Sequence, residues 1–167
     1  MFNTMTDTDL VYNIVEELLL GSIDGVFISS RSVSGGRAGS KLPGVVNPFL
    51  ANNPYATHVK KGVSTPGGPI IMGKYRLKVH ELRPAWIRLV PFAENAMGDR
   101  SGFAIHGRGS HGSDGCIVPT DFSVVKLIYS LVKSREESNK AAPTLAVVAI
   151  GDIDFIDARL KKLRQTA

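Results

Sequence analysis

Short apolar runs, each ended by a polar or turn-forming cluster, divide the chain and predict several short β-strands. Apolar and polar residues alternate over 75–80 and 86–90, as they do in strands with one buried face. Residues 26–28 and 103–105 are apolar without a break, and 144–150 is apolar after Thr144, which indicates buried strands. The pattern therefore favours a sheet-based core.

Helical periodicity is clearest after Thr120 and Asp121, either of which can cap the N-terminus of a helix. The apolar stripe of this helix consists of Val124, Val125, Ile128, Leu131 and Val132. A second amphipathic helix is predicted over 153–165. Residues 8–19 fit both a helical stripe and short strands, and the pattern favours the helix. Serine, glycine, proline and asparagine clusters over 29–54 predict loops.

Length and composition predict one domain, 1–167, in which the patterning leaves residues 1–31 without a firm assignment. Seventeen glycines and nine prolines require many turns, which favours short strands. Neither an internal repeat nor an interdomain linker is visible. The predicted fold class is α+β, with a β-rich core and a few peripheral helices.

The net charge of +5 suits an anionic partner. Nucleic acid is disfavoured, because the Lys and Arg residues form no concentrated run and aromatic residues do not interleave with them. No apolar run approaches the length of a membrane span. The acidic N-terminus lacks the basic region of a signal peptide, so we expect synthesis in the cytoplasm. A single cysteine excludes an internal disulfide framework and a multi-cysteine zinc site.

That cysteine, Cys116, lies in a glycine-rich loop between the predicted strand 103–105 and a strand predicted to begin at Ile117. A thiol needs a neighbouring base or cation to become a nucleophile, and His106 ends the preceding strand. Gly115 allows a sharp turn, in which the amides of Gly115 and Cys116 can face an oxyanion, and Ser113 can hold the turn. The pattern predicts nucleophilic catalysis by Cys116 with His106 as the base.

Two other interpretations of this loop remain open. A lone cysteine is often a small buried core residue. The ligand types of His106, His111, Asp114 and Cys116 also suit a metal ion, although the glycine spacing fits a nucleophile turn better and no second ligand cluster supports the metal. We therefore expect neither a metal nor another cofactor.

The segments Ile105-His106-Gly107 and Ser113-Asp114-Gly115-Cys116-Ile117 resemble the active-site signature of the L,D-transpeptidase (YkuD-like) superfamily. The short spacer between them is most similar to that of the L,D-transpeptidase-like effectors delivered by bacterial type VI secretion systems. Weaker pieces follow the same order along residues 32–150, namely Ser34-Gly35, Asn52-Asn53-Pro54, Gly67-Gly68-Pro69-Ile70, Gly73-Lys74-Tyr75 and Arg88-Leu89-Val90-Pro91. The wider superfamily has a histidine directly before the Gly-Cys pair, where this chain has Asp114.

The resemblance implies a YkuD-like β-sandwich or barrel and an enzyme that acts on peptidoglycan stem peptides, as an L,D-carboxypeptidase, an L,D-transpeptidase or both. Cys116 would form the thioester, His106 would be general base and acid, and the carbonyl of Gly107 would orient the imidazole. Ser113 and Gly115 would shape the oxyanion turn. The implied substrate-contacting residues are Ser34, Gly35, Tyr75, Arg108 and His111.

The resemblance also implies an antibacterial effector that reaches the periplasm of a target bacterium, with a secretion-system partner and a cognate immunity protein. Three alternatives stay open: a housekeeping L,D-transpeptidase, another Cys–His peptidase or amidase, and a non-catalytic wall-binding module. In papain-like peptidases the cysteine precedes the histidine, whereas here the order is reversed. The sequence does not choose between hydrolysis and transfer, and it does not name the target species or the third residue of the stem.

Overall fold

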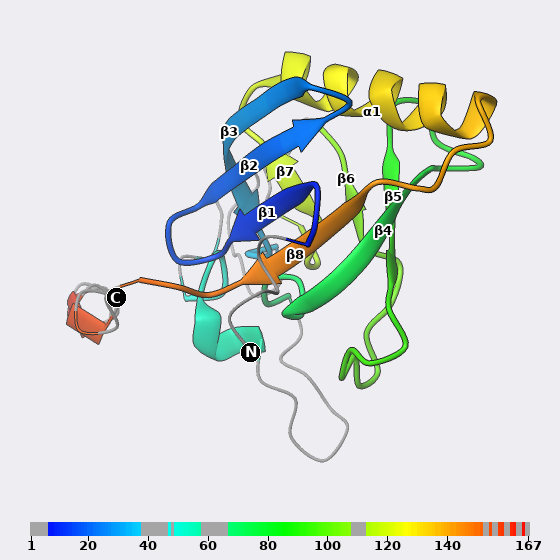
Figure 1. Cartoon of the computed structure of the whole chain (residues 1–167). Coiled ribbons are helices and arrows are strands. Elements are labelled where there is room, and N and C mark those ends of the chain that lie inside the picture. The colour runs from blue at the N-terminus through cyan, green and yellow to red at the C-terminus, as the bar shows by residue number, and fades with distance from the viewer. Residues whose placement is uncertain are drawn as a thin grey trace.

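The fold is a closed β-barrel of eight strands with one α-helix, as a computed structural model of the chain shows (Figure 1). The structure describes residues 7–37, 47, 49–57, 67–107, 113–151, 154, 157–158, 161–162 and 165. In the barrel the strands follow the order β1, β2, β3, β7, β6, β5, β4, β8. The strands are β1 Leu10–Asn13, β2 Leu18–Ile23, β3 Val26–Ser34, β4 Gly73–Val79, β5 Ile87–Pro91, β6 Ala104–Ile105, β7 Ile117–Pro119 and β8 Thr144–Val148. The predicted β-rich α+β class is confirmed at this level.

Two parallel pairings distinguish this barrel from a simple meander. Strand β8 closes the sheet by pairing parallel to β1 and antiparallel to β4, with Leu10 opposite Leu145 and Tyr75 opposite Leu145. Strand β6 pairs parallel to β7, with Ile105 opposite Ile117. This second pairing joins the two halves of the sequence motif, because the loop between β6 and β7 carries the residues that precede Cys116.

The helix α1, Phe122–Glu137, runs across one end of the barrel (Figure 1). Asp121 caps its N-terminus by accepting a hydrogen bond of 2.9 Å from the amide of Ser123, as the sequence predicted. Its buried residues Val125, Ile128 and Val132 belong to the same hydrophobic core as the inward side chains of the barrel. The helix therefore closes the barrel end with its apolar face.

The core consists of side chains that alternate along the strands toward the barrel interior. Its fully buried members include Leu10, Tyr12, Leu19, Ile28, Tyr75, Leu77, Ile87, Ile105, Ile117 and Leu145. Their period of two is the spacing expected for a strand with one face inward. The predicted buried strands at 26–28, 103–105 and 144–150 and the alternating strands at 75–80 and 86–90 are thus confirmed as parts of β3, β6, β8, β4 and β5.

The helix predicted over 8–19 is wrong, because this segment forms β1, a turn and the start of β2. Before the turn, Leu10, Tyr12 and Ile14 are buried, and their period of two is that of a strand. Apolar residues on the outward positions disguise this period as a helical stripe. Glu17, with φ of 58°, turns the chain into β2.

The loop predicted over 29–54 is also partly wrong, because β3 continues to Ser34. Ser30, Ser32 and Ser34 alternate on the inward side and are buried. These positions pair with β2 and then with β7, so backbone hydrogen bonds stabilise a strand that composition alone assigned to loop. After this strand, the described part of the segment includes a short 3-10 helix at Pro54–Thr57.

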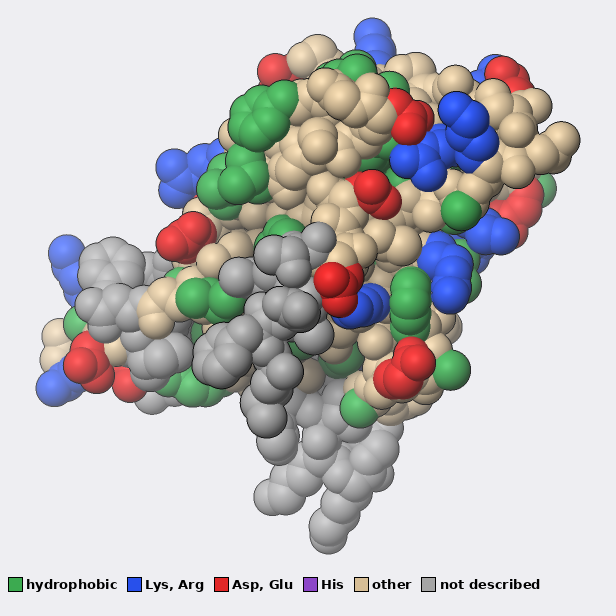
Figure 2. Space-filling model, in the orientation of Figure 1, with side chains coloured by type: hydrophobic (Ala, Val, Ile, Leu, Met, Phe, Trp, Pro, Cys, Tyr) green, Lys and Arg blue, Asp and Glu red, His purple; other side chains and the backbone are tan. Residues whose placement is uncertain are grey.

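The predicted C-terminal helix at 153–165 lies largely outside the described residues, and those described within it are helical. No helix in the described part of the chain has the length and apolarity needed to cross a bilayer. On the face shown in Figure 2, basic and acidic side chains are interspersed, so the net positive charge does not form one continuous basic surface there.

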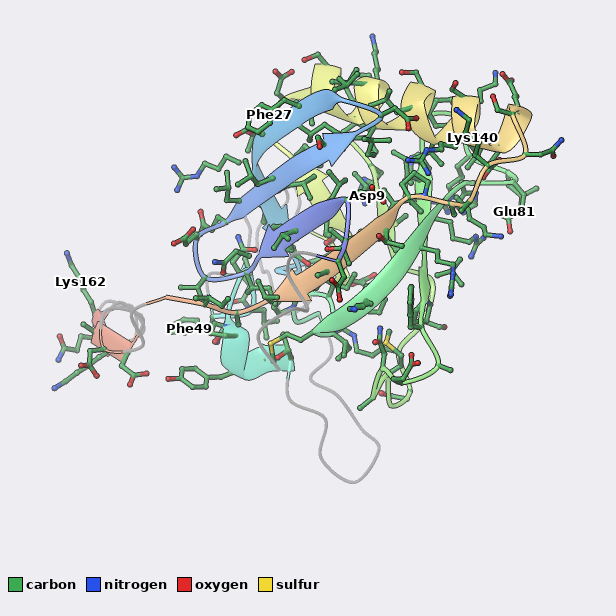
Figure 3. All side chains as sticks on the ribbon, viewed as in Figure 1. Asp9, Phe27, Phe49, Glu81, Lys140 and Lys162 are labelled. Carbon is green, nitrogen blue, oxygen red and sulfur yellow. The ribbon has the colours of Figure 1, made fainter. Side chains whose placement is uncertain are left out.

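Figure 3 labels two side chains, Asp9 and Glu81, that form polar contacts near strand ends of the barrel. Asp9 lies beside β8, where its carboxylate accepts a 2.8 Å hydrogen bond from the amide of Thr144. Glu81 lies at the turn between β4 and β5, where it forms a 2.9 Å ion pair with Arg88. The turn between β4 and β5 leads into Trp86.

Candidate active site

The register of β6 and β7 places His106 and Cys116 on one face of the sheet. Ile105 pairs with Ile117, His106 directly follows the first, and Cys116 directly precedes the second. Because side chains alternate between faces, and both isoleucines point into the core, His106 and Cys116 project to the opposite face. Both side chains are half-buried. The sheet thus places the predicted base just after β6 and the predicted nucleophile just before β7, on one face and two positions apart along the parallel strands.

Hydrogen bonds at the end of β6 fix the backbone and the imidazole of His106. Its backbone amide donates to the carbonyl of Ile117 at 3.2 Å, which extends the β6–β7 ladder by one residue. Its Nδ1 lies 3.0 Å from the carbonyl oxygen of Gly107. A carbonyl can only accept, so Nδ1 carries the proton and Nε2 is the nitrogen left for acid–base chemistry. This is the contact that the resemblance implied for Gly107.

Position 107 also requires glycine for a steric reason. A Cβ atom on this residue would overlap the ring of Phe122, the first residue of α1. The close approach of helix and strand therefore fixes the position of the carbonyl that holds His106. The sequence pointed to Gly107 through its carbonyl alone, because Phe122, which excludes a side chain at this position, is distant in sequence.

Trp86 is a site residue that the sequence analysis missed. Its indole stacks on the imidazole of His106 with 4.1 Å between ring centroids and 10° between planes. The register explains the contact, because Ile87 pairs with Ile105, so the residues next to them, Trp86 and His106, are also neighbours. The alternating pattern placed Trp86 at the start of a strand, but it contained no information about which strand lies beside it.

The turn from His80 to Trp86 holds this indole. The amides of Leu82 and Arg83 each donate to Nδ1 of His80 at 3.1 Å, and the amide of His80 donates to the carbonyl of Trp86 at 3.0 Å. The guanidinium of Arg83 lies over the indole, with its Cζ 4.4 Å from the ring centroid. The face of the imidazole that meets Trp86 is thus covered by a hydrogen-bonded turn.

The corner before Cys116 is held by the hydroxyl of Ser113, as predicted. This hydroxyl donates to the carbonyl of Cys116 at 2.7 Å and accepts from the amides of Gly35 at 3.1 Å and Gly115 at 3.3 Å. Gly115 has φ of 124°, and a Cβ there would overlap Arg100 and Phe103. Gly115 thus shapes the turn, but its amide is directed into that turn, which leaves the amide of Cys116 as the predicted oxyanion donor.

Ser34 holds the same corner through buried hydrogen bonds. Its side chain is fully buried, and its hydroxyl donates to the carbonyl of Gly115 at 2.8 Å while it accepts from the amide of Ile70 at 2.9 Å. Its backbone amide donates to Asn52 Oδ1 at 3.0 Å, and Tyr12 also donates to that oxygen. The predicted substrate contact of Ser34 is therefore replaced by a positioning role.

Gly35 and Tyr75 also differ from the predicted substrate contacts. The carbonyl of Gly35 accepts from the amide of Ser113 at 3.1 Å, its amide donates to the Ser113 hydroxyl, and a Cβ on it would overlap the backbone of Gly67 and Gly68. Tyr75 is fully buried within the barrel, where its hydroxyl donates to the carbonyl of Ile71 at 2.6 Å. Gly35 shapes the corner, and Tyr75 belongs to the core.

Arg100 is a second residue that the sequence analysis missed. Its guanidinium donates to the carbonyls of Pro69 at 2.6 Å, Gly68 at 2.8 Å and Asp114 at 2.7 Å. These bonds join the segment before β4 to the turn before Cys116. Burial lowers the pKa of Arg100, which nevertheless stays the positive charge of this corner because arginine pKa values are so high. No local sequence signal distinguishes it from a solvated arginine.

The electrostatics of the pair favour neutral partners at rest. Burial raises the pKa of the Cys116 thiol, and this effect outweighs the lowering by the Ala104 backbone and by the charges of Arg83 and Arg100. Burial also lowers the pKa of His106, against the raising effect of the Gly107 carbonyl. Burial therefore opposes the ionisation of the thiol, so the base that the sequence analysis pairs with Cys116 has to take up the proton during attack.

Two predicted substrate contacts, Arg108 and His111, lie outside the described residues. The ligand set of the metal interpretation includes His111 and so lies partly outside the described residues. Among the residues that the structure does describe, no three His, Cys, Asp or Glu side chains come together as metal ligands.

Neither a family model, nor a curated protein, nor a solved structure matches this chain.

Proposed function

We propose that the protein is a cysteine enzyme that cleaves the peptide bond before the terminal D-residue of a peptidoglycan stem peptide. The observation that carries this proposal is the β6–β7 pairing, which gives His106 and Cys116 the same face. The fixed Nδ1 of His106 and the glycine corner beside Cys116 add to it. The stem peptide as substrate, and a YkuD-like form of the barrel, rest on the resemblance of the two motif segments.

In the first half-reaction, Nε2 of His106 takes the thiol proton as Sγ of Cys116 attacks the scissile carbonyl carbon. A neutral thiol and a neutral imidazole are the correct starting forms for such general-base attack. The new S–C bond leaves an oxyanion, for which the amide of Cys116 is the candidate donor. The C–N bond then breaks, and the proton moves from Nε2 to the leaving amine. A thioester on Cys116 and a free D-amino acid result.

In the second half-reaction, Nε2 of His106 takes a proton from water as the water oxygen attacks the thioester carbon. The S–C bond breaks, and the sulfur recovers its proton from His106. The sum is one peptide bond and one water consumed, with one carboxylic acid and one amine released. An amine in place of water would give exchange or cross-linking by the same route.

The biological setting that we propose follows the same resemblance. An enzyme of this chemistry would act in the periplasm of a target bacterium, after delivery by a type VI system, and would require an immunity protein in the producing cell. The proposed reaction can be tested on purified protein, independently of this biological setting.

A muropeptide digest tests the proposed function. Purified protein is incubated with tetrapeptide muropeptides, and the products are separated and weighed by mass spectrometry. The expected result is loss of one terminal D-alanine, or its exchange when another D-amino acid is supplied. Cys116→Ala should abolish both while the protein remains folded. An unchanged digest from folded wild-type protein would remove the enzyme interpretation.

A further inference from the structure

One positive charge beside the His106–Cys116 pair has no described anionic partner. In the described part of the chain, the exposed guanidinium of Arg83 forms neither an ion pair nor a hydrogen bond and is held by its contact with Trp86. By contrast, Arg37 lies 3.7 Å from the carboxylate of Asp114, Arg88 pairs with Glu81 at 2.9 Å, and Arg100 donates to three carbonyls. Arg83 is the described arginine near the pair whose donors remain unused.

The way in which Arg83 is held suits it for binding an anion. A guanidinium that stacks on an indole uses its flat face, which leaves the N–H groups at its edge free for hydrogen bonds. The backbone on both sides is fixed, because the amide of Arg83 donates to His80 and its carbonyl accepts from Trp86 at 3.3 Å. Less conformational entropy is therefore lost on binding than for a mobile surface arginine.

The position of Arg83 fits one part of the substrate. Trp86 contacts both the imidazole of His106, at 4.1 Å, and the guanidinium of Arg83, at 4.4 Å. In the proposed reaction His106 protonates the leaving amine, and in a terminal residue the carboxylate is attached to the carbon next to that nitrogen. A residue that binds the terminal carboxylate must therefore lie close to the imidazole. The positive charge of Arg83 also acts on both members of the pair, since it lowers the pKa of His106 and of Cys116.

We infer that Arg83, presented on the indole of Trp86, binds the free carboxylate of the residue that the enzyme removes. This inference rests on the proposed function and narrows its substrate class. The enzyme would prefer stems that end at the cleaved residue over stems that continue beyond it or carry a terminal amide. Guanidinium binds carboxylate by two parallel hydrogen bonds, so the preference depends on the shape of the group as well as on its charge.

A binding experiment tests this inference separately from turnover. Cys116→Ala protein is titrated with two synthetic tetrapeptide stems, one ending in free D-alanine and one in D-alanine amide. Quenching of the single tryptophan reports binding. We expect the free acid to bind about tenfold more tightly than the amide, because one charge-assisted hydrogen-bonded pair contributes about this much to affinity. The difference in affinity should be smaller in 0.5 M salt, which screens the charges. Adding Arg83→Gln should remove the difference, and Arg83→Lys should retain part of it.

The matched control is Arg76→Gln. Arg76 is another exposed arginine held by an aromatic ring, with its Cζ 4.0 Å from the centroid of Phe92, and it lies on β4. This control should leave the preference for the free acid unchanged. Equal binding of the two stems by the Cys116→Ala protein, binding of neither, or a preference that survives Arg83→Gln would overturn the inference. Cleavage by the wild-type enzyme is scored separately, so a failure of the proposed function is visible on its own.

Discussion

At the scale of single residues, the candidate site combines a half-buried thiol with an imidazole whose proton position is fixed. The Gly107 carbonyl holds the proton of His106 on Nδ1, and Trp86 covers one face of the ring. Cys116 is shielded enough for burial to dominate its pKa. In the reaction that we propose, the proton would therefore transfer during attack, in contrast to sites that store a thiolate–imidazolium pair.

The pH dependence of alkylation tests this resting state. Because the pKa of the Cys116 thiol is raised, a smaller fraction is thiolate at neutral pH than in an unfolded chain. The midpoint of iodoacetamide labelling, followed by protein mass, should lie at higher pH in the native protein than in the same protein in urea. A native midpoint below that of the unfolded chain would show an activated thiolate.

The same shift has a consequence for stability. A thiol with a raised native pKa contributes stability that is complete below the unfolded pKa, about 8.5, and that is lost as the pH rises through the native value. The free energy of unfolding should therefore fall above about pH 8.5, and less so in Cys116→Ala. A urea denaturation series from pH 7 to 10 measures both proteins side by side.

At the scale of elements, the corner before Cys116 is fixed by segments that lie far apart in sequence. Asn52 accepts from Tyr12 on β1 and from the amide of Ser34 on β3, and Ser34 in turn donates to Gly115. Each of these polar groups is buried, so each requires a partner. The residue Asn52 thereby connects two strands of the barrel to the nucleophile turn.

Substitution of Asn52 tests this connection. Asn52→Ala removes the acceptor of two buried donors, of which Tyr12 retains a 3.3 Å contact with the carbonyl of Ser32. The expected loss is about 2–4 kcal/mol of unfolding free energy, measured by urea denaturation. The substitution should also increase the alkylation rate of Cys116, because the corner loosens.

The control for Asn52→Ala is Asn139→Ala. Both asparagines have left-handed backbones, with φ of 49° and 53°, but Asn139 is exposed after the end of α1. The control therefore measures the cost of the backbone conformation alone, about 1–2 kcal/mol for a residue other than glycine. Equal losses from the two substitutions would contradict the structural role that we assign to the Asn52 hydrogen bonds.

The elements also show what the sequence could and could not predict. Strands with apolar inward residues were found, because their period is visible locally. Strand β3 was predicted to end at Ile28, because its later inward positions are buried serines, which pair with β2 and then with β7. The 8–19 segment was assigned to a helix, because apolar residues occupy both faces of the β1 strand.

The same division applies to the candidate site. His106, Gly107, Ser113 and Cys116 were predicted, because they lie in two short segments whose residue types carry the chemistry. Trp86 and Arg100 were missed, because each reaches the site only through non-local pairing of strands or loops. Ser34 and Tyr75 were assigned to substrate, because burial cannot be read from order in the sequence.

At the scale of the whole molecule, the closed barrel is a rigid support with the site on its outward face. The inward residues of β6 and β7 belong to the one hydrophobic core, while α1 covers the barrel end and presses on Gly107. Closure through β8 leaves no described strand of the barrel without neighbours on both sides. The positions of His106 and Cys116 therefore depend on the integrity of the complete sheet.

The most direct test of the central claim is the mass of the protein during turnover. Wild-type protein is mixed with a tetrapeptide stem, quenched in acid within milliseconds to seconds, and weighed intact. The account predicts a transient increase equal to the stem minus D-alanine, located on Cys116 by peptide mapping and sensitive to hydroxylamine. The adduct should form far more slowly in His106→Gln. Release of D-alanine by Cys116→Ala at the wild-type rate, with no adduct in either protein, would contradict it.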